Sequence, residues 1–149
     1  MASRGDITVK LFLAAIMLTG CGAPIKHIYK DYELLQYEKL FDSYVEKSGK
    51  GSNGLAVSLH LGDTNVDNRI GVCYKKENQR SIVIDRSFWL TASAVKKTAL
   101  MFHELAHCKL DLGHVEPGSG SLMEPVMPSE SKLRSSWDYL LDKLFKERS

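Results

Sequence analysis

Three histidines and a glutamate near the middle of the chain form the pattern best suited to chemistry. His103 and His107 flank Glu104 in the order HExxH, and His114 follows seven residues after the second histidine. On a helix, residues four apart lie on one face, one turn from each other, so both imidazoles can bind one metal ion. Zinc is the metal typical of this pattern, and the glutamate then polarises a water molecule. The sequence therefore predicts one Zn²⁺ per chain, bound by His103, His107 and His114.

The identity of the third zinc ligand has alternatives. Asp111 and Glu116 are also close to the motif, but a carboxylate would weaken the Lewis acidity that three neutral imidazoles leave intact. The two other histidines, His27 and His60, lie far from the motif in the sequence. We expect His27 to be an ordinary tether residue and His60 to be an ordinary strand residue. An accidental HExxH on a helix without metal is a further interpretation of the pattern.

The first twenty residues are typical of an export signal. Arg4 and Lys10 precede an apolar run over residues 11–20, which is too short to span a bilayer and fits a secretory signal. The run ends in Leu18-Thr19-Gly20-Cys21, which resembles a bacterial lipobox, a signal whose cysteine is lipidated and becomes the mature N-terminus. We expect removal of residues 1–20, lipidation of Cys21, a tether over residues 21–29 and a single domain over residues 30–149. An ordinary signal peptide or a buried helix is the alternative.

The residue after the cysteine bears on location. Aspartate there often retains such lipoproteins in the inner membrane, and this chain has Gly22, which favours the outer membrane if the cell has one. The formal net charge is +2, and no basic cluster indicates nucleic acid or a polybasic membrane patch. We expect a monomer in the bacterial cell envelope, with the membrane as a partner through Cys21 and a protein or peptide as substrate.

Cysteine usage agrees with export. If Cys21 carries lipid, Cys73 and Cys108 remain as a possible disulfide, which an oxidising compartment permits. Because Cys108 directly follows His107, this bond would tie the HExxH helix to the preceding strand region. Two buried free thiols are the alternative. We do not expect Cys108 to bind the metal, since it lies about 100° around the helix from His107.

Hydrophobic periodicity predicts a small α+β domain. The expected elements are a helix over residues 30–47, strands over residues 55–61, 69–75 and 81–85, a helix from Thr91 or Ser93 to about Leu110, and an amphipathic helix over residues 131–146. Either Thr91 or Ser93 could cap the HExxH helix. The leucine and aromatic stripes on these elements are most simply core residues.

Two motifs together resemble the metzincin clan of zinc peptidases. One is the HExxH with its third histidine, and the other is Ser121-Leu122-Met123-Glu124-Pro125. In metzincins a methionine in a turn lies beneath the metal; Met123 matches this Met-turn position, and Met127 is the second choice. The resemblance implies a minimal version of the fold: an N-terminal helix, a small twisted sheet, an active-site helix, the Met-turn and a C-terminal helix. The chain also resembles small bacterial envelope proteins of this type in the positions of its two later cysteines.

The spacing of the third histidine departs from the clan. Metzincins place a glycine three residues and a histidine six residues after the second histidine, where this chain has Leu110 and Gly113. His114 comes one residue later. Left-handed backbone conformations at Asp111 and Gly113 would let the chain turn later and still bring His114 back to the metal.

The resemblance implies a zinc metalloendopeptidase. The metal would lower the pKa of a bound water towards ~7, and Glu104 would take its proton and pass it to the leaving amine. Some metzincins stabilise the oxyanion with a tyrosine after the Met-turn, where this chain has Glu124-Pro125. Residues 81–85 match the edge strand on which metzincins pair their substrate, although they fit an interior strand equally well. The rival functions are a zinc-bearing envelope protein that binds without proteolysis and a structural lipoprotein with an accidental motif.

Overall fold

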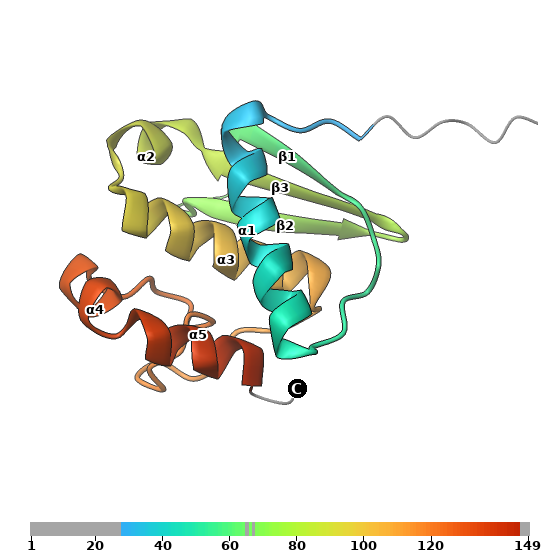
Figure 1. Ribbon diagram of the computed structural model, residues 1–149. Helices are drawn as coiled ribbons and strands as arrows, with labels where there is room; N and C mark the ends of the chain where they lie inside the picture. Colours follow the sequence, from blue (N-terminus) through green and yellow to red (C-terminus); the bar gives the residue numbers. More distant parts are fainter. Residues whose placement is uncertain (1–27, 65, 67, 147–149) are drawn as a thin grey trace, which may run out of the picture.

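The computed structural model describes residues 28–64, 66 and 68–146 (Figure 1). The expected signal peptide, Cys21, His27 and most of the tether lie outside these residues. In the described part the fold is α+β, as predicted, with five helices and a three-stranded mixed sheet. None of the described helices is long and apolar enough to cross a membrane.

The elements follow one another in an order that matches the expected one, with one addition and one break. They are α1 (Tyr32–Ser48), β1 (Val57–Gly62), β2 (Gly71–Lys76), β3 (Gln79–Asp85), α2 (Arg86–Thr91), α3 (Ala94–Lys109), α4 (Glu130–Ser135) and α5 (Trp137–Lys146). The short helix α2 was not predicted; Asp85 starts it by accepting a hydrogen bond from the Phe88 N–H (2.7 Å). The single C-terminal helix that we expected is two helices, because Ser136 leaves the helical conformation (φ −125°).

The sheet has the strand order β1-β3-β2, with β1 parallel and β2 antiparallel to β3. A two-residue turn at Glu77 and Asn78 joins β2 directly to β3, and β1 pairs with the other side of β3. The edge-strand assignment of residues 81–85 is therefore wrong, and the interior-strand alternative is correct. The edge strand near the HExxH helix is β2.

The helices lie in layers against the sheet. Figure 1 shows α1 crossing in front of the sheet, α3 running beside it, and α4 and α5 on the side of α3 away from the strands. The layers meet in one buried core in which Phe41 of α1, Phe102 of α3 and Phe145 of α5 contact one another. This packing fixes α3, and with it the HExxH motif, between the sheet and the C-terminal helices.

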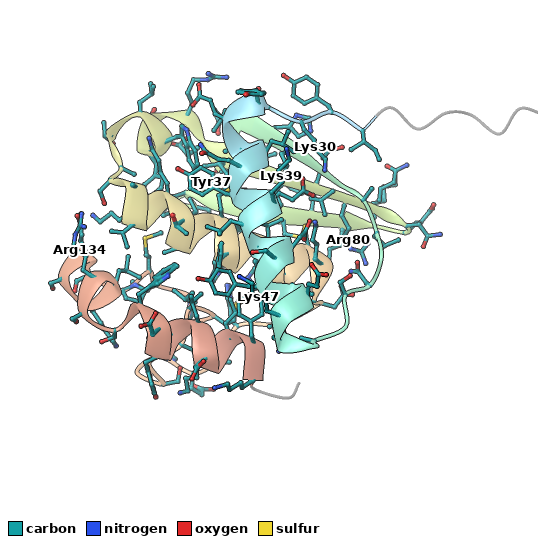
Figure 2. All side chains as sticks on the ribbon, viewed as in Figure 1. Lys30, Tyr37, Lys39, Lys47, Arg80 and Arg134 are labelled. Atoms are coloured by element: carbon teal, nitrogen blue, oxygen red, sulfur yellow. A yellow bond between two sulfur atoms is a disulfide. The ribbon has the colours of Figure 1, made fainter. Side chains whose placement is uncertain are left out.

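A buried carboxylate joins α1 to the C-terminal end of α3. Glu38 is only 4% exposed and pairs with Lys30 (2.5 Å) and with Lys109 (2.9 Å), which also reaches Asp42 (2.7 Å). Figure 2 shows Lys30 beside the first turn of α1. The chain before α1 is itself attached to the sheet, since the Tyr29 carbonyl accepts the Leu59 N–H (2.9 Å). The described domain thus includes the end of the expected tether.

Candidate metal centre

The HExxH residues lie on α3, as predicted, and Ser93 is the N-cap residue of this helix, although its side chain makes no capping hydrogen bond. His103 and His107 are one turn apart on the same face, and their Nε2 atoms are 3.0 Å from each other. The helix end is capped by Asn53, whose Nδ2 donates to the Cys108 carbonyl (2.9 Å).

His114 reaches the same point from the loop after α3. Its Nε2 lies 3.1 Å from His103 Nε2, and the three histidines are a group whose potential ligand atoms all lie within 4.8 Å of one another. The chain returns because Asp111 adopts a left-handed conformation (φ 55°) and the Leu112 N–H bonds back to the Ala106 carbonyl (3.2 Å). The expected turn at Asp111 is therefore present, whereas Gly113 is not among the residues with positive φ.

The two alternative carboxylate ligands are not part of this group. Asp111 Oδ2 accepts from Asn53 (2.9 Å), and Oδ1 pairs with Lys75 (3.1 Å) and Arg80 (3.5 Å). The hydrogen bond from Asn53, followed by Lys75, holds the pKa of Asp111 below its usual range. Asp111 thus secures the turn that delivers His114. Glu116 is exposed and lies outside the group of potential ligands.

Backbone carbonyls fix the tautomers of the two helix histidines. His103 Nδ1 is 2.6 Å from the Leu122 carbonyl oxygen, and His107 Nδ1 is 2.6 Å from the Leu112 carbonyl oxygen. A carbonyl oxygen only accepts, so each Nδ1 carries the hydrogen and each Nε2 presents a lone pair. The two Nε2 atoms are 3.0 Å apart, so their lone pairs repel each other, and a cation bound between them would remove that repulsion. In metal-binding histidines, one ring nitrogen usually donates to a carbonyl or carboxylate oxygen in this way, and the other nitrogen binds the metal.

The surroundings favour neutral imidazoles, which is the form that binds metals. Burial lowers the pKa of His103 to about 4, against the opposing effect of its hydrogen bond to Leu122. Burial is also the main reason why the pKa values of His107 and His114 lie below the usual value. The cluster is therefore uncharged near neutral pH and ready to accept a cation.

Glu104 lies beside the cluster and is 4% exposed. Burial raises the pKa of its carboxyl to about 7, while the Cys73 backbone amide and the charge of Arg69 act in the opposite direction. A carboxyl with this pKa both accepts and donates a proton near neutral pH. Gly71 of β2 packs directly against it, and a Cβ at that position would be 2.8 Å from Glu104 Oε1.

The predicted Met-turn is a turn at Ser121-Leu122-Met123-Glu124, and it is tied to both ligand-bearing segments. The Leu122 carbonyl contacts His103, and the Met123 carbonyl accepts the Val115 N–H (3.0 Å), next to His114. Met123 is buried in the core (2% exposed), whereas Met127 lines the pocket beside the cluster. The turn thus supports two of the three histidines through its main chain.

Glu124, which follows Met123 directly, organises the neighbouring loop. Its carboxylate accepts the N–H groups of Gly118 (3.0 Å), Gly120 (2.5 Å) and Ser121 (3.2 Å). These backbone hydrogen bonds, with the Gly118 amide contributing most, lower its pKa. A carboxylate engaged in this way does not serve as an oxyanion donor.

Cys73 and Cys108, the pair that we expected, form a disulfide with a Cα–Cα distance of 5.8 Å. The bond joins β2 to α3 beside His107. Because the Cys73 backbone amide also lowers the pKa of Glu104, the disulfide ties the strand beside Glu104 to the helix that carries it. His60, which we expected to be an ordinary strand residue, lies on β1 and stacks on Tyr29.

The cluster opens into a pocket of about 420 Å³. One wall consists of β2 and the residues before it, a second is α3, and a third is the segment after the Met-turn, which includes Pro125, Met127 and Pro128. Arg69 and Gly71 in the first wall were not predicted as site residues. For Gly71 the available signal was a glycine inside a strand, which often marks a close approach.

No family model, curated protein or solved structure matches this chain.

Proposed function

We propose that this protein is a zinc-dependent peptidase that hydrolyses peptide bonds in the cell envelope. The observation that carries the proposal is the convergence of three neutral histidines next to a buried, protonatable Glu104 inside a pocket. A purely structural metal site is usually closed by four protein ligands, and this group offers three and faces a pocket.

The donor set fits zinc. Zn–N bonds of about 2.0–2.1 Å in a tetrahedral site place the nitrogen atoms about 3.3 Å apart. The Nε2 distances of 3.0 and 3.1 Å are close to this separation. His103, His107 and His114 would therefore hold the ion with small side-chain movements.

Glu104 supplies the proton transfers. When bound, zinc would lower the pKa of a water molecule and polarise the scissile carbonyl. A carboxylate oxygen of Glu104 takes a proton from the attacking water and delivers it to the nitrogen of the leaving amine. The close approach of Gly71 confines the carboxylate, and the Cys73 amide favours its ionised form.

The substrate is an extended peptide along β2. This strand is an edge of the sheet, and Gly71, Val72 and Cys73 line the pocket. A peptide that adds to a free strand edge gains main-chain hydrogen bonds, and its side chains contact the pocket walls alternately. β2 thus takes the role that the metzincin resemblance implied for residues 81–85, for which an interior strand was the equal alternative. We place the domain at the membrane through a lipidated Cys21, with the outer membrane favoured.

The test is metal content and cleavage measured on matched proteins. The folded protein lacking residues 1–21 should contain one zinc and cleave casein, and a chelator should abolish cleavage until zinc is restored. Glu104→Gln should keep the zinc and lose about 10²–10⁴-fold in rate. Zinc with no cleavage of any peptide would favour the binding-protein alternative, and a protein without zinc would contradict both.

A further inference from the structure

The charged side chains that line the pocket differ in whether they have partners. Lys75 pairs with Asp111 (3.1 Å), Glu124 accepts loop amides, and Glu104 is the buried base. Arg69 also lines the pocket, and it forms no ion pair or side-chain hydrogen bond with any of the described residues. The pocket therefore presents one exposed arginine side chain that forms no ion pair with any of the described residues.

The backbone of Arg69 is held in place by the segment before β2. The buried Thr64 hydroxyl (3% exposed) donates to the Arg69 carbonyl (2.9 Å), and the Arg69 N–H donates to the Val66 carbonyl (3.2 Å). Tyr74 of β2 donates to the Thr64 carbonyl. These bonds fix the point from which the arginine side chain extends.

Arg69 and the candidate centre share one pocket, which Arg69 lines together with Glu104 and the three histidines. Arginine presents paired N–H donors that match the two oxygens of a carboxylate, and such charge-assisted bonds are about twice as strong as neutral ones. A metal cation in the histidine cluster would add to the attraction for an anionic group.

We infer that Arg69 selects peptides with a carboxylate next to the scissile bond, either an acidic side chain or a free C-terminus. The inference rests on the proposed peptidase function and names the substrate class for the same site. Arg69 is the specificity-determining residue because, among the charged side chains of the pocket wall, it alone has no partner within the described chain.

The experiment compares matched peptides and matched variants. One set carries Glu or Gln at each position flanking a known cleavage site, and a second set has a free or an amidated C-terminus. The zinc-loaded wild type should cleave the carboxylate-bearing peptide about 10- to 100-fold faster in kcat/KM. Arg69→Gln should bring the ratio of kcat/KM for the carboxylate-bearing and neutral peptides close to one, and Arg69→Lys should keep part of the wild-type ratio. The set that responds identifies the source of the carboxylate.

Arg134→Gln is the control, since Arg134 lies on α4, pairs with Glu130 (2.6 Å) and is not part of the pocket wall (Figure 2). It should keep the wild-type preference. An equal loss for acidic and neutral peptides in Arg69→Gln, or no preference in the wild type, would overturn the inference.

A binding measurement separates this inference from the proposed function. Calorimetry with zinc-loaded Glu104→Gln protein measures affinity for the same peptides without cleavage. If no protein cleaves any peptide but binding is tighter for the carboxylate form and depends on Arg69, carboxylate recognition stands and the peptidase proposal fails. If peptides are cleaved without an Arg69-dependent preference for carboxylates, the peptidase proposal stands and carboxylate recognition fails.

Discussion

Gly71 of β2 lies directly against Glu104 of α3. A Cβ at Gly71 would be 2.8 Å from Glu104 Oε1, 3.0 Å from Glu104 Cγ and 2.9 Å from Leu100 Cδ1. Real Cβ atoms essentially never approach other atoms so closely, and both Glu104 and Leu100 are buried, so neither can easily move away. The absence of a side chain at position 71 therefore determines where the proposed base lies.

The first prediction is that Gly71→Ala displaces Glu104. We expect a loss of about 1–3 kcal/mol in the free energy of unfolding from overpacking, and a fall of about 10²-fold in kcat from the misplaced carboxylate, with zinc retained. Gly62→Ala is the matched control, because a Cβ at this other strand glycine would meet only Val83 Cγ1 at 3.9 Å. Urea unfolding and peptide cleavage measure the two effects. Wild-type activity in Gly71→Ala would show that the contact does not position the base.

Local patterns in the sequence predicted the parts of the site that lie on one element. Four-residue spacing on a helix is a property of the helix itself, so His103 and His107 were expected on one face and are found there. The contact of Gly71 with Glu104 depends on how β2 packs against α3. A glycine inside a strand signals a close approach, but it does not identify Glu104 as the partner.

The place of residues 81–85 in the sheet could not be predicted for a related reason. The pattern of residues 81–85 fits an edge or an interior strand, and only the pairing of β1 with the far side of β3 decides between them.

The return of the chain to bring His114 beside the other two histidines was predicted in part. Asp111 was recognised as able to adopt a left-handed conformation. The residues that hold Asp111 there, Asn53 and Lys75, come from other parts of the chain.

The second prediction concerns the third ligand. His114→Ala should lower the zinc content of dialysed protein well below one per chain, because two imidazoles remain where three converge. His60→Ala is the control, since His60 lies on β1 outside the cluster and should leave the zinc content unchanged. Elemental analysis of both proteins gives the answer. Full zinc content in His114→Ala, combined with its loss in Glu116→Ala, would move the ligand assignment to Glu116.

The third prediction is an acid-dependent loss of stability that involves Glu38. Burial alone would raise the pKa of this carboxyl, but hydrogen bonds and charges from Lys30 and Lys109 outweigh it and bring the pKa below 4.5. A lowered carboxyl pKa stabilises the folded state above the unfolded-state value of about 4.5, and this contribution is lost as the pH falls through the folded-state pKa. The free energy of unfolding should therefore decrease as the pH drops below about 4.5.

Glu38→Gln tests this assignment. The variant should be about 1–3 kcal/mol less stable at neutral pH, and the difference from wild type should shrink as the pH falls. Glu46→Gln, an exposed position on the same helix, gives the pH dependence to be expected without the ion pairs. Urea unfolding between pH 3 and 7 on all three proteins is the measurement. A difference between Glu38→Gln and wild type that is constant over this range would rule out titration of Glu38 as the cause.

The last prediction concerns location. Leu18-Thr19-Gly20-Cys21 follows a short apolar run with basic residues before it, so we expect Cys21 to be lipidated and residues 1–20 to be removed. Several acyl chains on one cysteine hold a protein stably at a membrane, whereas a single chain does so only marginally. The wild type should therefore enter the detergent phase in phase partitioning, and Cys21→Ala should stay in the aqueous phase with the fold and zinc content unchanged, since Cys21 lies outside the described domain. Partitioning of both proteins into the aqueous phase would mean that the chain is secreted rather than anchored.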